Sequence, residues 1–336
     1  MQLNRFFCLL LALLLMLVGC TGGDPLPTDG VTTTASPAPQ SPAPQEPLPQ
    51  EPSKVSETYR ILISSDLHCT DLREYHGTDY ATRMQHWVDS VLEEHRREPI
   101  DLIVINGDVS LDHCEGGGAI LLHREVTTKT FVDQYLSQLP KEIDVFLMPG
   151  NHEQQSQTQW YLATGNLRQG YRVLGNNLLI LLDNYNMDLN PLVNSNGTYS
   201  GVDIPYVEGL MNEYPTHNVY LISHYFDMDR EGLPFRALLA VNDRIIGLFH
   251  GHTHRASVTD LGKLCNNKTI AQTGNFSYAN PEEANAFWGF RELVITEDSA
   301  YSRYIAVSSR EILETAPLPD RRIMLPICYY GTMPKD

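Results

Sequence analysis

The chain has 336 residues, with 24 lysines and arginines against 41 aspartates and glutamates, and its formal net charge is −17. This acidity argues against nonspecific binding to nucleic acids and anionic membrane surfaces, because both depend on basic patches.

Residues 1–20 have the features of an export signal. Arg5 gives a positive start, and residues 6–18 form an apolar run that is too short to cross a bilayer comfortably. The run ends in Leu-Val-Gly-Cys at residues 17–20, which resembles the lipobox of bacterial lipoproteins. This resemblance implies that Cys20 is lipidated and anchors the exported protein to the outer face of the cytoplasmic membrane or to an outer membrane. An ordinary signal peptide that ends near a cysteine is the alternative.

Residues 21–57 form a proline-rich segment that contains nine of the 21 prolines, with Ser-Pro-Ala-Pro-Gln at Ser36 and again at Ser41. Such a composition cannot build a core and favours extended polyproline II, so we predict a spacer reaching on the order of 100 Å. The folded domain is then expected to span residues 58–336, in which we find no second linker.

The folded region alternates between helical and extended segments. Residues 80–97 are predicted to form a helix, because Met84, Trp87, Val88 and Val91 recur at helical spacing. The other expected elements are a helix at 124–138 and strands at 59–65, 102–106, 143–148, 178–182, 219–223, 244–249, 269–272 and 290–295. Strands outnumber helices in the second half, which predicts a mixed α/β protein with two packed sheets and helices outside.

Side chains that can bind metals follow five of these strands: Asp66 and His68, Asp108, Asn151 and His152, His224, and His252 and His254. Taken alone, Gly107-Asp108 would be an ordinary turn. Ligands of open α/β proteins bind beyond the carboxyl ends of strands, however, and five such ends carry donors here. Side chains alternate along a strand, so each pair at spacing i, i+2 is predicted to point in one direction.

The donor types limit the choice of metal. Mixed aspartate, asparagine and histidine donors suit divalent ions such as Mn, Fe, Zn, Co or Ni. Seven donors, with His152 excluded, are too many for one tetrahedral ion but fit two ions that share one carboxylate.

Beyond the signal and Cys20, the cysteines are Cys69, Cys114, Cys265 and Cys328. They form no Cys-x-x-Cys pair, so a thiolate zinc site is not expected, whereas disulfides and buried thiols are equally compatible with their spacing.

Five motifs in sequence order resemble the calcineurin-like metallophosphoesterase family: Asp66-x-His68, Gly107-Asp108, Gly150-Asn151-His152-Glu153, Ser223-His224 and Gly251-His252-x-His254. The resemblance implies an α/β fold, a four-layer α/β/β/α sandwich of two mixed sheets flanked by helices, with a two-metal site at the sheet ends. It implies that one metal is held by Asp66, His68, Asp108 and His254. It implies that the other is held by Asp108, Asn151, His224 and His252.

The resemblance gives His152 a catalytic role instead of a ligand role. The matching histidine of the family faces the scissile phosphate and assists the leaving group, steadied by an acidic neighbour that would be Asp71 or Asp112 here. Two divalent ions lower the pKa of a shared water, which yields a hydroxide nucleophile near neutral pH, and they neutralise charge on the phosphoryl group. The expected function is hydrolysis of a phosphomonoester or phosphodiester outside the cytoplasm.

Two other functions compete with this one. The first is a metal-containing lipoprotein that binds an envelope ligand without turnover. The second is a binuclear amidohydrolase, which is disfavoured because its His-x-His lies on an early strand. A location outside the cytoplasm makes cell-envelope or scavenged phosphate esters the expected substrates. The lipid is the only expected membrane contact. The oligomeric state stays open.

Several other polar residues have weaker expectations attached to them. His86 and His95 are expected at the surface or in packing, and His250 in a strand or beside the site. His113 is expected in a mobile loop with the glycine-rich residues 114–118, with substrate contact as the alternative. Surface positions are expected for three arginines, with phosphate contact as the alternative: Arg168, Arg230 and Arg255.

Overall fold

The computed structural model describes residues 57–70, 78–110, 127–153, 155–185, 197–277, 287–308 and 323–332. All of these residues belong to a single compact unit. The predicted signal, the proline-rich segment, and the expectations for Cys20, Asp71, Asp112, His113 and the loop at 114–118 lie outside the described residues. None of the described helices is both long and apolar enough to cross a bilayer.

The first sheet, as far as the described residues show it, has six strands in the order β12-β11-β10-β1-β2-β3. Its parallel part consists of β1 (Tyr59–Ser64), β2 (Leu102–Asn106) and β3 (Asp144–Met148). Its antiparallel part consists of β10 (Trp288–Ile295), β11 (Ser299–Ser308) and β12 (Ile323–Thr332). Helix α2 (Tyr80–Arg97) forms the crossover from β1 to β2 and is capped by Asp79, whose side chain accepts the N–H of Thr82.

The second sheet, within the same described ranges, has the order β4-β5-β6-β7-β9-β8. Its strands are β4 (Gly170–Leu174), β5 (Asn177–Leu182), β6 (Asn218–Ser223), β7 (Ile245–His250), β8 (Val258–Asp260) and β9 (Thr269–Gln272). β5, β6, β7 and β9 run parallel, and the two edge strands are antiparallel to their neighbours. In chain order, α5 (Ile204–Glu213) lies between β5 and β6, and α6 (Leu233–Val241) lies between β6 and β7. The short 3-10 helix η4 (Lys263–Cys265) lies between β8 and β9.

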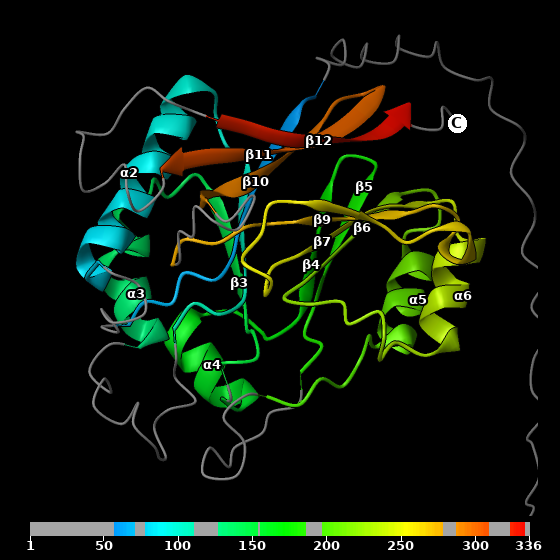
Figure 1. Cartoon of the computed structure of the whole chain (residues 1–336), viewed down its shortest axis with the longest axis horizontal. Helices are drawn as coiled ribbons and strands as arrows, with labels where there is room; N and C mark the ends of the chain where they lie inside the picture. The colour runs from blue at the N-terminus through cyan, green and yellow to red at the C-terminus, as the bar shows by residue number, and fades with distance from the viewer. Residues whose placement is uncertain are drawn as a thin grey trace, which may run out of the picture. The chain divides into compact units, whose positions relative to one another are not determined.

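Among the described residues, three large apolar cores separate four layers. Successive residues of β1 face different cores: Leu62 packs with Trp87 of α2, whereas Ile61 packs between the sheets with Leu179 and Ile222. A third core lies between the second sheet and helices α5 and α6. Figure 1 shows α2 and α3 (Thr128–Gln134) beside the first sheet and α5 and α6 beside the second. The predicted four-layer α/β/β/α sandwich of two mixed sheets is confirmed.

The structure changes the predicted elements in a few places. The helix expected over 124–138 consists of α3, capped by Thr127, followed by a separate 3-10 turn, η3 (Leu136–Gln138). The described elements absent from the prediction are β4, β8, β11, β12, α4 (Gln157–Thr164), α5, α6 and η4. Strand β4 alternates between exposed and half-buried positions, so it lacks the continuous apolar run that reveals the central strands.

His86 is buried on α2, with its ring 5.6 Å from that of Phe276 and 6.1 Å from that of Trp288. Burial lowers the pKa of His86 to about 4, below its ordinary value of 6.5. The unfolded chain therefore takes up this proton at higher pH than the folded protein does. We expect the free energy of unfolding to fall by up to about 3 kcal/mol as pH decreases from 6.5 to 4.

Replacing His86 with leucine is expected to remove this part of the pH dependence. Urea unfolding of both proteins at a series of pH values between 4 and 7 measures it. A variant with the same pH profile as the wild type would contradict the expectation.

Candidate metal centre

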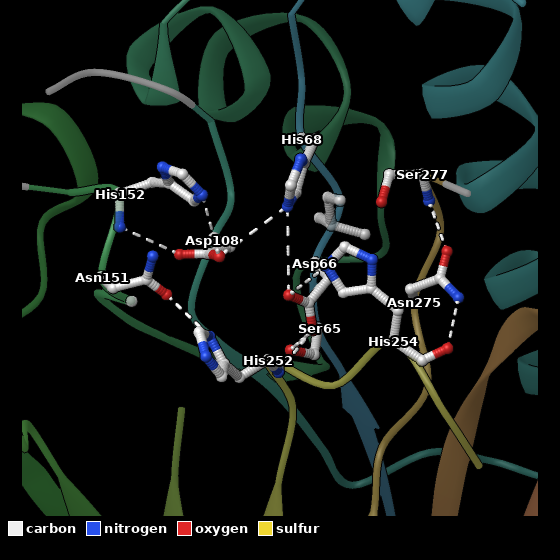
Figure 2. A network of polar contacts seen from close by, with 12 residues as sticks. Ser65, Asp66, His68, Asp108, Asn151, His152, His252, His254, Asn275 and Ser277 are labelled. Carbon is white, nitrogen blue, oxygen red and sulfur yellow. Dashed lines mark hydrogen bonds and ion pairs between the residues drawn. The ribbon is translucent and has the colours of Figure 1, made fainter. Parts of the chain in front are cut away.

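The candidate site residues all lie just beyond the carboxyl ends of strands, namely β1, β2 and β3 of the first sheet and β6 and β7 of the second. Figure 2 shows that side chains from both sheets converge there, with Asp108 and Asp66 near the middle and His152 and His254 on either side. The five strand ends that carry donors therefore meet at one place.

Five of the candidates have a left-handed main chain. The angle φ is 52° at Asp66, 45° at His68, 50° at Asp108, 64° at His252 and 58° at His254. Such angles are uncommon for residues other than glycine, and they concentrate at functional sites, where the surrounding structure holds them. Among the other described non-glycine residues, only two neighbouring asparagines share this conformation.

The paired donors follow the strands and do not lie within them. β1 ends at Ser64 and β7 at His250, before Asp66 and His252 are reached. Strand alternation therefore does not aim the side chains. The turns do so instead, and they are held by main-chain hydrogen bonds such as that from the N–H of Asp66 to the carbonyl of Gly107 at 3.1 Å.

The first group of donors consists of Asp66, His68 and His254. Asp66 Oδ1 lies 3.1 Å from His254 Nε2 and 3.9 Å from His68 Nε2. Burial opposes the charge of Asp66, but His254 outweighs it and lowers the pKa of the carboxyl to about 2. Burial lowers the pKa of His68 to about 4. Asp66 and His68 thus offer a charged carboxylate and a neutral imidazole, the states that metal ligation requires. At His254, Asp66 outweighs burial and raises the pKa of the imidazole.

The second group of donors consists of Asn151, His224 and His252. Asn151 Oδ1 lies 2.9 Å from both His224 Nε2 and His252 Nδ1. The other ring nitrogen of His224 lies 2.9 Å from the carbonyl oxygen of Asn106. Because a carbonyl can only accept, His224 Nδ1 carries a proton, and Nε2 is the atom directed at the centre.

Asp108 lies between the two groups. Its Oδ2 atom is 3.7 Å from His68 Nε2 in the first group and 3.2 Å from His224 Nε2 in the second. Although burial opposes its charge, His224 and His152 hold the pKa of Asp108 well below its usual range. In return, Asp108 overcomes the effect of burial on His224 and raises the pKa of that imidazole to about 9.

The donor set fits divalent ions. The donor atoms of Asp66, His68 and His254 all lie within 4.8 Å of one another, as do those of Asp108, His224 and His252. Carboxylate and imidazole groups, together with the amide oxygen of Asn151, suit divalent ions from manganese to zinc. Each group could therefore hold one divalent ion.

His152 lies at the edge of this arrangement. Its main-chain N–H donates to Asp108 Oδ1 at 3.1 Å, and its Nε2 atom is 3.7 Å from Asp108 Oδ2. These distances also make it part of a third cluster of possible donors with His68 and Asp108. Its side chain is 21% exposed, against 4% for His68 and 1% for His224, so His152 borders the solvent.

Glu153 is an important residue to which the sequence analysis assigned no role, although it belongs to the Gly-Asn-His-Glu motif. The buried carboxylate accepts the N–H groups of Asp108 at 3.0 Å, Ser110 at 2.9 Å and Gly150 at 2.6 Å. It thereby joins the loop after β2 to the loop after β3. Its position within the motif was the only signal available in the sequence.

Two glycines allow the loops to approach one another. Gly107 has φ of 103°, and a Cβ atom there would lie 2.5 Å from Nδ1 of His224. A Cβ atom on Gly251 would overlap the side chain of Ser65 and lie 2.7 Å from Asp66 Oδ2. These positions therefore need glycine because the ligand-bearing loops pack directly against them.

The remaining polar candidates occupy different environments. His250 is the last residue of β7, as expected, and its Nδ1 accepts the N–H of Phe226 at 3.2 Å. Arg230 is exposed and pairs with Asp227, and Arg255 is exposed. The expectation of a surface position is wrong for Arg168, which is 3% exposed and pairs with Asp183 at 2.6 Å.

Known proteins share the sequence pattern and the fold of this chain. A family model described as calcineurin-like phosphoesterase matches residues 59–270. The structure of a dimetal phosphatase from Danio rerio has 15% sequence identity and a TM-score of 0.54, and the match covers 73% of this chain and 95% of that one. The structure of PhoD has 10% identity and a TM-score of 0.51 over 84% of this chain and 71% of that one. At these identities the two structures show a shared fold, and no curated protein matches the sequence.

Proposed function

Because the chain belongs to the calcineurin-like phosphoesterase family, we propose that it hydrolyses phosphate esters with two divalent ions bound at the strand ends. Family membership makes the protein a metal-dependent phosphoesterase. We propose, in addition, the number of ions, their ligands and the role of His152. The observation that carries the proposal is the position of Asp108, whose Oδ2 atom lies within 3.7 Å of imidazoles from both donor groups.

We assign the ligands as follows. One ion is held by Asp66, His68, Asp108 and His254, and the other by Asp108, Asn151, His224 and His252. When bound, such ions neutralise phosphoryl charge and lower the pKa of water at the site. Asn151 suits its place because a neutral amide oxygen adds no negative charge opposite an incoming phosphate. The candidate ions are Mn, Fe, Zn, Co and Ni.

His152 is proposed to assist the leaving group. Its partial exposure puts the imidazole between the buried donors and solvent, from which a substrate enters. Burial lowers the pKa of His152, so we expect a neutral ring that donates a hydrogen bond through N–H to the departing oxygen. Its main-chain bond to Asp108 Oδ1 ties its position to the proposed bridging carboxylate.

We also propose that the enzyme is exported and anchored through a lipid on Cys20. The apolar run at 6–18 and the lipobox-like sequence at 17–20 support this location, and the proline-rich segment would hold the catalytic domain away from the membrane. A cell-envelope or scavenged phosphate ester is then the proposed substrate.

The decisive experiment uses the full chain expressed in a bacterial host, stripped of metal and reloaded with Mn²⁺. Hydrolysis of an aryl phosphomonoester and of a bis-aryl phosphodiester is measured, and metal-dependent release of aryl alcohol is expected from at least one of them. Mass spectrometry of the same preparation is expected to find a lipid on Cys20. Mn²⁺ binding without release from either ester would favour the ligand-binding lipoprotein over the enzyme.

A further inference from the structure

In the part of the chain that the structure describes, three arginines are buried around the candidate metal centre, and none of them lies on a ligand-bearing loop. Arg83 is on α2, Arg168 lies between α4 and β4, and Arg291 is on β10. Arg83 and Arg291 are fully buried. A guanidinium stays charged at physiological pH, so burying it is costly unless hydrogen-bond acceptors surround it.

Arg83 holds the loop that follows β1. Its Nη1 atom donates to the carbonyl of Leu67 at 2.7 Å and to that of Phe276 at 3.2 Å. Its Nη2 atom donates to the carbonyls of His68 at 2.8 Å and Thr70 at 3.2 Å. One side chain thus joins the turn that carries two proposed ligands to the segment that follows β9.

Arg168 holds the loop that follows β3. Its Nη1 atom donates to the carbonyls of Glu153 at 3.2 Å and Gln155 at 2.5 Å. Its Nε atom is paired with Asp183, just after β5. The loop that carries Asn151 and its neighbours is thereby attached to the second sheet.

Arg291 holds the loop that follows β7. Its Nη2 atom donates to the carbonyl of Ala256 at 2.8 Å, two residues after His254. Its Nε atom donates to the carbonyl of Gln272 at 3.0 Å, at the end of β9. The turn with two further proposed ligands is therefore joined to both sheets.

We propose that Arg83, Arg168 and Arg291 are positioning residues that hold the ligand loops in place before ions bind and so raise the affinity for divalent ions. The inference rests on the proposed metal centre. Main-chain carbonyls in these turns lie outside the sheet ladders and need other donors when buried. The planar guanidinium presents five N–H groups and can serve several carbonyls together, whereas lysine offers three donors from one point.

Arg60 provides a matched control. It lies on β1 and is 3% exposed, and it pairs with Glu94 at 2.7 Å and Glu292 at 2.5 Å. It also donates to the carbonyl of Glu94 on α2 at 2.9 Å. None of these partners belongs to a ligand-bearing loop, so its loss is expected to reduce stability without a specific effect on ion binding.

The test compares R83M and R83K with R60M and R60K in the full chain. Mn²⁺ affinity is measured by isothermal titration calorimetry on metal-stripped protein, and stability by urea unfolding in a chelator. We expect R83M to bind Mn²⁺ about 10- to 100-fold more weakly, the effect typical of losing groups that orient ligands, and R83K to show a smaller loss. Hydrogen exchange without metal is expected to quicken at residues 67–70 in both Arg83 variants.

The other possible results distinguish failure of the proposed function from failure of the inference about the arginines. Wild-type protein that binds no divalent ion would overturn the proposed function together with this inference. Wild-type binding that both Arg83 variants leave unchanged would overturn the inference alone. Equal losses of affinity in the Arg83 and Arg60 variants would also overturn it, since they indicate general loosening. If R83M does not fold, R83K and R60K carry the comparison.

Discussion

Replacing Asp108 with asparagine is expected to weaken ion binding at both groups of donors together and to remove most of the hydrolytic activity. Asparagine keeps the shape of the side chain but loses the charge of a carboxylate that lies 3.7 Å from His68 and 3.2 Å from His224. We expect the loss of affinity to reach at least the roughly 100-fold that removal of a supporting partner can cause. Elemental analysis and calorimetric titration with Mn²⁺ measure it.

Asp144→Asn is the matched control for this substitution. Asp144 begins β3, at the end of the strand opposite the candidate centre, and its partly exposed carboxylate pairs with Arg172. Removing an exposed ion pair changes stability little, so metal content and turnover are expected to match those of the wild type. Two tightly bound ions in the D108N protein would remove Asp108 from the bridging role.

Replacing His152 with alanine is expected to lower turnover by about 100- to 10,000-fold while the protein keeps both ions. The physical reason is that His152 is proposed to act on the leaving oxygen, whereas the seven other donors hold the metals. His152 also belongs to a third cluster of possible metal donors with His68 and Asp108, so the metal content of the variant is measured together with its turnover rate. Loss of an ion in the H152A protein would show that His152 is a ligand.

The leaving group provides a second test of His152. An ester with an acidic phenol departs without help, whereas an alkyl ester needs a hydrogen-bond donor or a proton. The defect of the H152A protein is therefore expected to shrink as the leaving group becomes more acidic. His217→Ala, at the amino end of β6 and away from the carboxyl ends, is expected to retain wild-type rates. A defect independent of the leaving group would contradict the proposed role.

The buried strands and their terminal donors could be predicted from the sequence because both signals are local. A strand covered on both faces is apolar at nearly every position, and the predicted bounds at 102–106 and 269–272 agree with the structure. The polar residues after such runs stand out by their chemistry alone. For the same reason, the half-exposed β4 and the hydrogen-bonding role of Glu153 were not predicted.

The sequence by itself determined the fold class, the family and the kinds of donor available, since these depend on residue type and order. Only the tertiary structure decided how the donors are aimed. The turns at Asp66 and His252 are left-handed, which strand periodicity does not predict. They are supported by contacts between residues far apart in the chain, such as those from Arg83 to the carbonyls of His68 and Phe276. Interactions of this kind form only when the strand ends meet, so no local pattern of residues encodes them.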